Sequence, residues 1–517
     1  MESVSADGSI DIYNLTEVMM KKRKLPDIFY NPISMAGAII ASVVFGTILI
    51  LMVVSAMWSS LPPYFGIVTF IVFPAVLIVA LLIIPLGALI ERKRYHQLAQ
   101  TGGSLMPKID LSEPKQRRAF FIFSTGTLLL MVFTAIGSYR AFEATESVQF
   151  CGELCHRVMK PEFVTHADSP HARVACVQCH VGPGASWYVK SKLSGAYQIY
   201  AVLFNKFPRP IPTPIKNLRP ARVTCEQCHW PQSFKGERRI TKTFYLEDSV
   251  NTRWDLDMLV RIGRSTSAEP QRPSVHWHVT HTVEFIPTDS TSQTIPWVRV
   301  VDKNGKTETF TTSDNPFTPD SIKHVKIKTM DCMDCHNRPT HIIKSPGDAI
   351  NDAMATGDIS PALPWIKQEG VNALVPRYVN TKDALDSIAL YINSFYHRKY
   401  PQVATHDGSA ITVAIASLQT IYKQNFFPYM RADWRAYPND LGHMEYQGCF
   451  RCHDGHHKSA DGQVIPHSCT TCHVILAEGS KPDSVVNLDG VPFVHPHVGI
   501  GDSWKDGSCT DCHDGTQ

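Results

Sequence analysis

Three long apolar stretches dominate the first part of the chain. They cover residues 33–58, 64–90 and 119–139, and none of them contains a charged residue. Each reaches the length of about 20 residues that a helix needs to cross the hydrocarbon core of a bilayer. Uncharged apolar runs of about 18 residues or more favour a membrane span over a buried core helix. The pattern therefore predicts a module of three transmembrane helices over residues 33–139.

Lysine and arginine are distributed unevenly around these stretches. Residues 21–24 are all basic, and further basic residues lie in the loop 91–118, whereas the link 59–63 has none. Because lysine and arginine collect on the cytoplasmic side, we expect the tail 1–32 and the loop 91–118 in the cytoplasm. Everything after residue 139 is then expected on the outer face of the membrane. No cleavage site of small residues follows the first stretch, which predicts a retained anchor and not a signal peptide.

Beyond residue 139 the apolar pattern changes to shorter periodic segments. Alternation over residues 275–286 predicts a strand. The pair Asn304-Gly305 predicts a hairpin turn between strands at 295–301 and 307–312. Apolar residues with helical spacing predict helices over residues 381–396 and 411–426.

The composition argues against two classes of protein. The chain has 517 residues, with 50 basic and 47 acidic side chains and a net charge of +3. This balance does not favour a nucleic-acid-binding protein, whose domains are usually strongly basic. Aromatic residues make up 10% of the chain, which argues against intrinsic disorder.

All 14 cysteines follow residue 150, and they form close pairs. In six pairs the spacing is C-x-x-C and a histidine follows directly, which is the attachment signature of c-type haem. The two thiols bind the porphyrin covalently, and the histidine binds the iron from one face. The six motifs are Cys176/Cys179/His180, Cys225/Cys228/His229, Cys332/Cys335/His336, Cys449/Cys452/His453, Cys469/Cys472/His473 and Cys509/Cys512/His513.

A seventh pair, Cys151 and Cys155 followed by His156, has one extra residue between its thiols. Its place at the head of the series, and its use of the two remaining cysteines, make it the seventh expected haem site.

The motifs divide the outer region into three parts. Residues 140–235 hold three haem sites, a β-rich insertion over 236–325 holds none, and residues 326–517 hold four.

Three other uses of cysteine fit this pattern less well. Structural zinc needs four ligands per site and does not require a histidine after every second cysteine. Disulfides suit the exported side of a membrane but leave these histidines unexplained. Thioredoxin-like redox pairs come once or twice in a chain, and not seven times. We therefore expect seven covalently bound haem c groups.

Of the 23 histidines, many remain after the attachment histidines are set aside, and they can supply second axial ligands. Their positions around the motifs favour His171, His341, His443, His457 and His495. One of His276 and His278 is expected to reach an iron, for which we take His278, while the other is structural. Three more histidines compete with their neighbours and stay open: His456, His467 and His497. Met159 is a further candidate, because thioethers ligate haem iron, although methionine more often fills a core.

These features resemble the NapC/NirT family of membrane-bound quinol dehydrogenases. The resemblance rests on the membrane anchor, on the motif that ends at His180, on Lys192, and on the run Cys335-His336-Asn337-Arg338-Pro339-Thr340-His341. The family core would cover about residues 119–345. Three spans, seven haem sites and the motif that ends at His453 extend the likeness to heptahaem cytochromes of metal-respiring bacteria.

The resemblance implies roles for single residues. His171 would serve the fourth haem, His341 the third, and Met159 the first. Lys192 lies where the family has a lysine at its quinol pocket. The chain departs from the family in the longer spacing of its first cysteine pair. It also has Gln198 where the family commonly has a carboxylate that could accept a quinol proton.

The sequence thus predicts a membrane-anchored multihaem cytochrome c. Its three-span helical module would carry a mostly helical or irregular, haem-packed periplasmic region with a small β insertion. The predicted function is to oxidise menaquinol and pass electrons to soluble periplasmic c-type cytochromes, in anaerobic or extracellular metal respiration. The expected partners include membrane lipid and exclude nucleic acid. Two alternatives stay open: a terminal reductase with an open haem for a small oxyanion or a metal, and an anchor or relay subunit for a separate catalytic partner.

Overall fold

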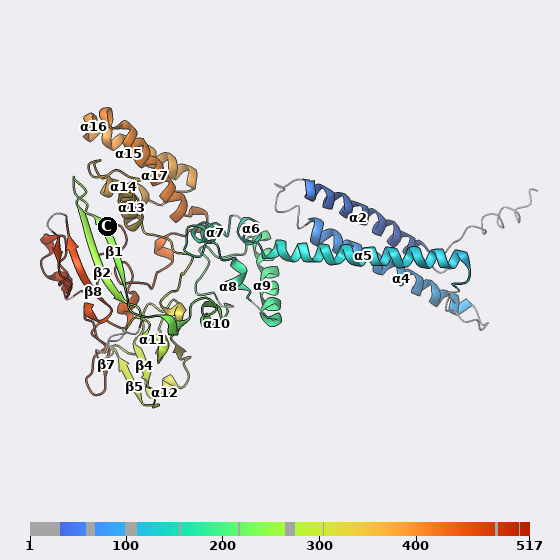
Figure 1. Ribbon diagram of the computed structural model, residues 1–517, viewed down its shortest axis with the longest axis horizontal. Helices are drawn as coiled ribbons and strands as arrows, with labels where there is room; N and C mark the ends of the chain where they lie inside the picture. The colour runs from blue at the N-terminus through green and yellow to red at the C-terminus, as the bar shows by residue number, and fades with distance from the viewer. Residues whose placement is uncertain are drawn as a thin grey trace, which may run out of the picture. The chain divides into compact units, whose positions relative to one another are not determined.

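The computed structural model describes residues 31–57, 68–98, 111–154, 157–182, 184–215, 218–263, 274–302, 304–480, 484–505 and 507–517. It divides into two compact units, Met1–Leu154 and Cys155–Gln517. Figure 1 labels the elements of both units in chain order. The basic run at 21–24 and the expected haem residues Cys155 and His156 lie outside the described residues.

Three long apolar helices make up most of the first unit: α2 (Pro32–Met57), α4 (Phe73–Leu98) and α5 (Pro114–Glu146). A π-helical turn, η2 (Val68–Val72), leads into α4, and α6 (Val148–Glu153) follows α5. All three long helices are long and apolar enough to cross a membrane, which confirms the three predicted spans. Small residues lie where α2 packs against α4, as is common between membrane helices. Ser34 Oγ donates a hydrogen bond to the Ile84 carbonyl at 2.8 Å.

Five of the six cysteine motifs described in the second unit lie in two segments that differ in regular structure, and the motif at Cys332 lies between these segments. We call residues 157–235 and 438–517 the haem segments. The first contains α7 (Lys160–Ala167), α8 (Cys176–His180), α9 (Ala185–Leu203), α10 (Ala221–Cys225) and the 3-10 turn η3 (Pro231–Ser233). The second consists mainly of 3-10 turns and loops. Few apolar side chains are buried among the described residues of the two haem segments. They are Val158, Val181, Ala201, Ala221, Ile475 and Leu476.

Two antiparallel sheets connect distant parts of the second unit. One has the order β1-β2-β8-β9, formed by Glu237–Tyr245, Arg253–Arg261, His473–Gly479 and Val485–Val486. The other has the order β6-β3-β4-β5-β7, formed by Lys328–Thr329, Thr282–Ile286, Trp297–Val301, Thr307–Thr311 and Lys458–Ser459. Four of these strands lie beyond residue 325. The β-rich insertion therefore does not form its sheets alone.

The hairpin prediction is confirmed, and the strand prediction before it is corrected. β4 pairs with β5 from Val301 and Thr307 outward, and Gly305 has a φ of 80°, the left-handed conformation that the turn requires. The predicted strand over 275–286 begins only with β3 at Thr282. The residues before it form a helical turn, α11 (Trp277–Thr280). This turn lets the ring of His278 bond to the Val275 carbonyl at 3.1 Å.

A compact group of helices between the motifs carries the main apolar core. We call residues 346–437 the helical segment. It contains α13 (Pro346–Thr356), α14 (Ile366–Leu374), α15 (Thr381–Lys399), α16 (Pro401–His406) and α17 (Gly408–Asn425), while α12 (Pro319–Ile322) lies before it. α15 and α17 confirm the two predicted helices. Their inner faces are fully buried at Ile388, Ile392, Tyr396 and Leu418.

Candidate haem sites

Each described C-x-x-C-H motif lies on a single helical turn. The first of them forms α8, and the second begins at Cys225, the last residue of α10. The other four contain the 3-10 turns η4 (Cys332–Asp334), η7 (Gly448–Arg451), η8 (Cys469–Thr471) and η11 (Cys509–Asp511). In several motifs the histidine N–H donates to the carbonyl of the first cysteine, as from His229 to Cys225 at 2.8 Å. The 13 described cysteines form no disulfide. The local fold therefore brings two cysteine side chains and one imidazole together in each described motif.

A second imidazole faces each of the six described attachment histidines. The separations of the ring centroids are 6.4 Å for His180–His341, 5.9 Å for His171–His229, 6.3 Å for His276–His336, 5.7 Å for His278–His453, 6.2 Å for His443–His473 and 5.9 Å for His495–His513. Two histidines that share one metal ion, each with a metal–nitrogen bond of about 2 Å, place their ring centroids about 6 Å apart. The six pairs therefore fit a haem iron held from both sides.

Hydrogen bonds on the far side of the rings select the tautomer that ligates iron. Nδ1 of His171 lies 3.2 Å from the Pro339 carbonyl, and Nδ1 of His276 lies 2.8 Å from the Ile262 carbonyl. The same nitrogen of His341 lies 3.0 Å from the Glu162 carbonyl. A proton held at Nδ1 leaves the Nε2 lone pair for a metal.

The protonation of these rings also suits metal binding. Burial lowers the pKa of His180, His278, His336, His443, His453 and His473 below the ordinary value for histidine. Burial and then the positive charge of Arg338 lower the pKa of His341 to about 3. A histidine must be neutral to bind a metal ion. At neutral pH these rings are therefore in the form that a haem iron requires.

Ring positions in the structure differ from three of the expected histidine assignments. His276 and His278 each face an attachment histidine, so both of them, and not His278 alone, are placed as candidate second ligands. His457 does not take such a position, because its Nδ1 bonds to Asp454 at 2.9 Å and its Nε2 to the Ile295 carbonyl at 2.7 Å. The histidines left open (His456, His467 and His497) take none of the six positions in the described part of the chain.

The third difference concerns which haem each expected ligand of the family core would serve. His171 faces His229 of the third motif and not His336 of the fourth. His341 faces His180 of the second motif and not His229 of the third. The reason is a set of contacts between residues 162–174 and 338–341. Ser169 Oγ bonds to Thr340 Oγ1 at 2.7 Å there, and these contacts place each histidine at the motif nearest to it.

Sequence reasoning missed the buried groups that support His341. Glu162 lies 3.2 Å from Nδ1 of His341 and 3.4 Å from the guanidinium of Arg338. Burial raises the pKa of Glu162, and the charge of Arg338 partly opposes that rise. His166, also buried, bonds through Nε2 to the Val174 carbonyl at 2.9 Å, just before the second motif. Only Arg338 had a signal in the sequence, as part of the run that ends at His341.

The motifs follow one another in space in the order in which they occur in the sequence. Cysteine thiols of consecutive motifs lie close enough to interact electrostatically, from the second motif to the seventh: Cys179 with Cys228, Cys225 with Cys332, Cys335 with Cys449, Cys449 with Cys472, and Cys469 with Cys509. Cys509 Sγ also lies 3.8 Å from Nδ1 of His443, a ligand candidate of the sixth site. These interactions link the described motifs as a series from the second to the seventh.

The first expected haem site can be placed only in part. Cys151 lies on α6, and Met159 directly precedes α7. Cys155 and His156 lie outside the described residues. The roles of Met159 and of the longer spacing therefore stay predictions.

The candidate quinol residues lie on α9. Lys192 Nζ is 5.0 Å from the centre of the Tyr188 ring, and Gln198 Nε2 donates to Ser194 Oγ at 3.4 Å. Six residues on a helix turn the side-chain direction by about 120° from one to the other, so α9 does not bring the two groups onto one face. The helix also exposes a stripe of large apolar side chains: Val189, Leu193, Tyr197, Tyr200 and Phe204.

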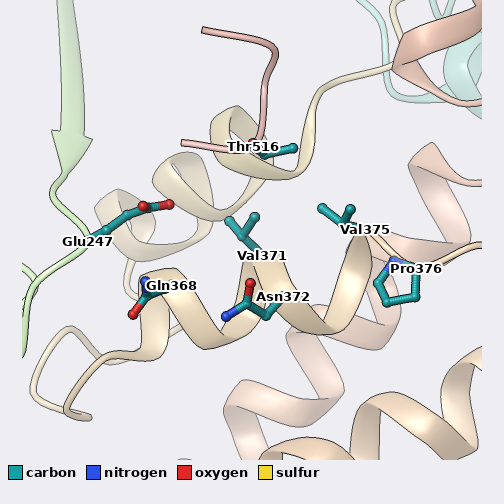
Figure 2. A pocket seen from close by; sticks show the side chains of 7 residues that line it. All are labelled: Glu247, Gln368, Val371, Asn372, Val375, Pro376 and Thr516. Atoms are coloured by element: carbon teal, nitrogen blue, oxygen red, sulfur yellow. The ribbon is translucent and has the colours of Figure 1, made fainter. Parts of the chain in front are cut away.

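A separate pocket lies on the helical segment. It has a volume of about 350 Å³ and is lined mainly by α14, together with Glu247 and Thr516 (Figure 2). Burial raises the pKa of Glu247, and the charge of Lys367 partly opposes that rise. The lining includes no residue that the sequence predicted as a haem or quinol ligand.

Comparisons with known proteins agree with this site. Residues 113–210 match the model of the NapC/NirT cytochrome c family, N-terminal region. The chain is 39% identical over 495 residues to the cytochrome c-type protein ImcH of Geobacter sulfurreducens. The aligned region covers 96% of this chain and 97% of that protein. No solved structure matches the chain. The haem motifs, the apolar helices and these similarities together place the chain in the NapC/NirT and ImcH family of multihaem c-type cytochromes anchored in the inner membrane.

Proposed function

We propose that this protein oxidises menaquinol and delivers the electrons, through seven covalently bound haem c groups, to soluble periplasmic c-type cytochromes. The observation that carries the proposal is the row of six facing imidazole pairs. A haem iron ligated on both faces has no open position for a substrate. The pairs therefore favour electron transfer over a terminal reductase for a small oxyanion or a metal. A role in anaerobic or extracellular metal respiration rests on the resemblance alone.

The chain contributes ligands, order and electrostatics to this function. Haem c, when bound, supplies reversible one-electron transfer. The Nδ1 hydrogen bonds of residues such as His276 and His341 fix the ring orientations, and burial keeps the ring of His341 neutral. Two electrons and two protons leave each menaquinol, so the chain must also bind the quinol and assist release of its protons.

Lys192 is the residue that we propose for the quinol. Its ammonium group would donate a hydrogen bond to a quinol oxygen and assist proton release. The exposed apolar stripe of α9 suits a helix that rests in the interfacial region of a membrane, where a quinol head group would be reached. Gln198, also expected at the quinol site, is left out of this contact, because its side chain points about 120° around α9 away from that of Lys192. An amide can hydrogen-bond a quinol oxygen but, unlike the carboxylate of the family, does not readily take up its proton.

The test is reduction of the purified protein in liposomes by menaquinol, followed by haem absorbance. Lys192→Met should lose most of the menaquinol-driven rate and keep full reduction by dithionite. Lys190→Met is the matched control, because Lys190 lies on the same helix, with its ammonium 4.7 Å from the Trp187 ring centre, and it should retain the wild-type rate. An unchanged menaquinol rate in Lys192→Met would remove Lys192 from the site.

The same preparation separates the two alternative functions. A high-spin haem signal that changes when an oxyanion is added would support a terminal reductase. If the isolated protein does not turn over menaquinol and a co-purifying enzyme restores turnover, the result would support an anchor or relay subunit.

A further inference from the structure

Arg219 differs from the other buried arginines of the described chain. Its side chain is 4% exposed, and its Nε and Nη1 atoms are buried without a hydrogen-bond partner. Arg338 pairs with Glu162, Arg451 with Asp440, and Arg261 with Glu237. A buried guanidinium with unpaired donors is strongly unfavourable. The site therefore calls for an anion that the described residues do not supply.

The position of Arg219 indicates what that anion is. Gly182 follows His180 by two residues, has a φ of 64°, and has no room for a Cβ, which would overlap the guanidinium of Arg219. The charge of Arg219 also acts on the thiol of Cys179. The unpaired donors therefore lie against the turn that leaves the second C-x-x-C-H motif.

We propose that Arg219 binds a propionate of the haem attached at Cys176 and Cys179. A haem carries two carboxylates, and the planar guanidinium matches a carboxylate with two parallel hydrogen bonds. Gly182 allows the guanidinium of Arg219 to lie against this turn, because any side chain at position 182 would displace Arg219. The proposal rests on the proposed haem at this motif and adds the residue that binds one of its carboxylates.

Pairing of Arg219 with a propionate would change the midpoint potential of this haem. A positive charge beside a propionate favours the reduced iron, because reduction adds negative charge to a site of low dielectric constant. Removal of that charge leaves the propionate uncompensated and lowers the midpoint potential of this haem. A merely structural arginine would change stability without changing a potential.

The experiment is a spectroelectrochemical titration of the full-length holoprotein and its variants. Arg219→Gln should shift one component of the titration to lower potential, and Arg219→Lys, which keeps the charge, should restore most of it. Gly182→Ala should lower the same component although Arg219 is still present. Arg173→Gln is the matched control, because Arg173 is exposed on the loop before the same motif, and it should superimpose on the wild type.

Two results would overturn the proposal. One is a titration of Arg219→Gln and Gly182→Ala that superimposes on that of the wild type. The other is an equal shift in Arg219→Lys and Arg219→Gln, which would deny a role to the charge. Intact mass of the wild-type protein shows separately whether all seven haems are attached. Menaquinol-driven reduction measures the proposed function independently of the potential.

Discussion

The helical segment, residues 346–437, and the haem segments, residues 157–235 and 438–517, differ in what stabilises them. The helical segment buries large side chains completely, among them Ile366, Leu374, Ile392 and Tyr396. The haem segments bury few apolar side chains in their described parts, and three of their cysteines are exposed: Cys228, Cys469 and Cys512. Apolar burial is the main stabilising contribution to a fold. The first region therefore has a protein core of its own, whereas we expect the haem segments to depend on bound haem for their stability.

The two regions also differ in how their backbones end and turn. In the helical segment, Asn380 caps α15 by accepting from the Asp383 N–H, and Gly357 ends α13 in a left-handed conformation. These are the signals of ordinary amphipathic helices. In the haem segments most motifs occupy one turn only, too short to be stable alone. From this difference we infer that covalent haem, once attached at the cysteine motifs, would take the place of a core.

The largest expected effect comes from withholding the haem. Full-length protein produced without covalent haem attachment should lose protection in the haem segments and keep it in the helical segment. Hydrogen exchange read by mass spectrometry measures both regions in one sample, with the holoprotein as reference. Equal protection of the haem segments with and without haem would contradict the comparison.

A smaller effect is expected from truncation within the protein core. Ile392 on α15 is fully buried, and Ile392→Ala should reduce the free energy of unfolding by about 2–5 kcal/mol. Leu390 on the same helix is 70% exposed, and Leu390→Ala should change it by less than about 0.5 kcal/mol. Denaturation followed by circular dichroism measures both, and the haem spectrum should be unaffected by either. Equal losses in the two variants would show that α15 does not depend on its buried face.

The smallest effect on stability is expected at a distal ligand. His276→Ala should convert one haem from low spin to high spin, because His276 is the imidazole that faces His336. His281→Ala is the control, since His281 stacks on Trp277 at 4.3 Å and faces no described attachment histidine. Electron paramagnetic resonance of the oxidised protein measures the change. An all-low-spin spectrum of His276→Ala would assign the ligand elsewhere.

Some features could be predicted from the sequence because neighbouring residues determine them. The spacing of Cys332, Cys335 and His336 fixes a single helical turn, and the three apolar stretches are long enough for three spans. Asn304-Gly305 supplies the left-handed conformation that its hairpin needs. The apolar period of α15 and α17 predicted both helices for the same local reason.

Only the tertiary structure decided which histidines face one another. His341 reaches His180, and His171 reaches His229, across long stretches of chain, and no spacing along the sequence encodes either contact. His276 was expected to be structural and faces His336, whereas His457, expected as a ligand, is held by Asp454 and Ile295. The unpaired, buried guanidinium of Arg219 likewise had no signal in the sequence. The sequence by itself predicts where haem is attached, because the attachment motif is local. Packing decided which imidazole faces each described attachment histidine, because the second imidazole comes from another segment whose position depends on the whole fold.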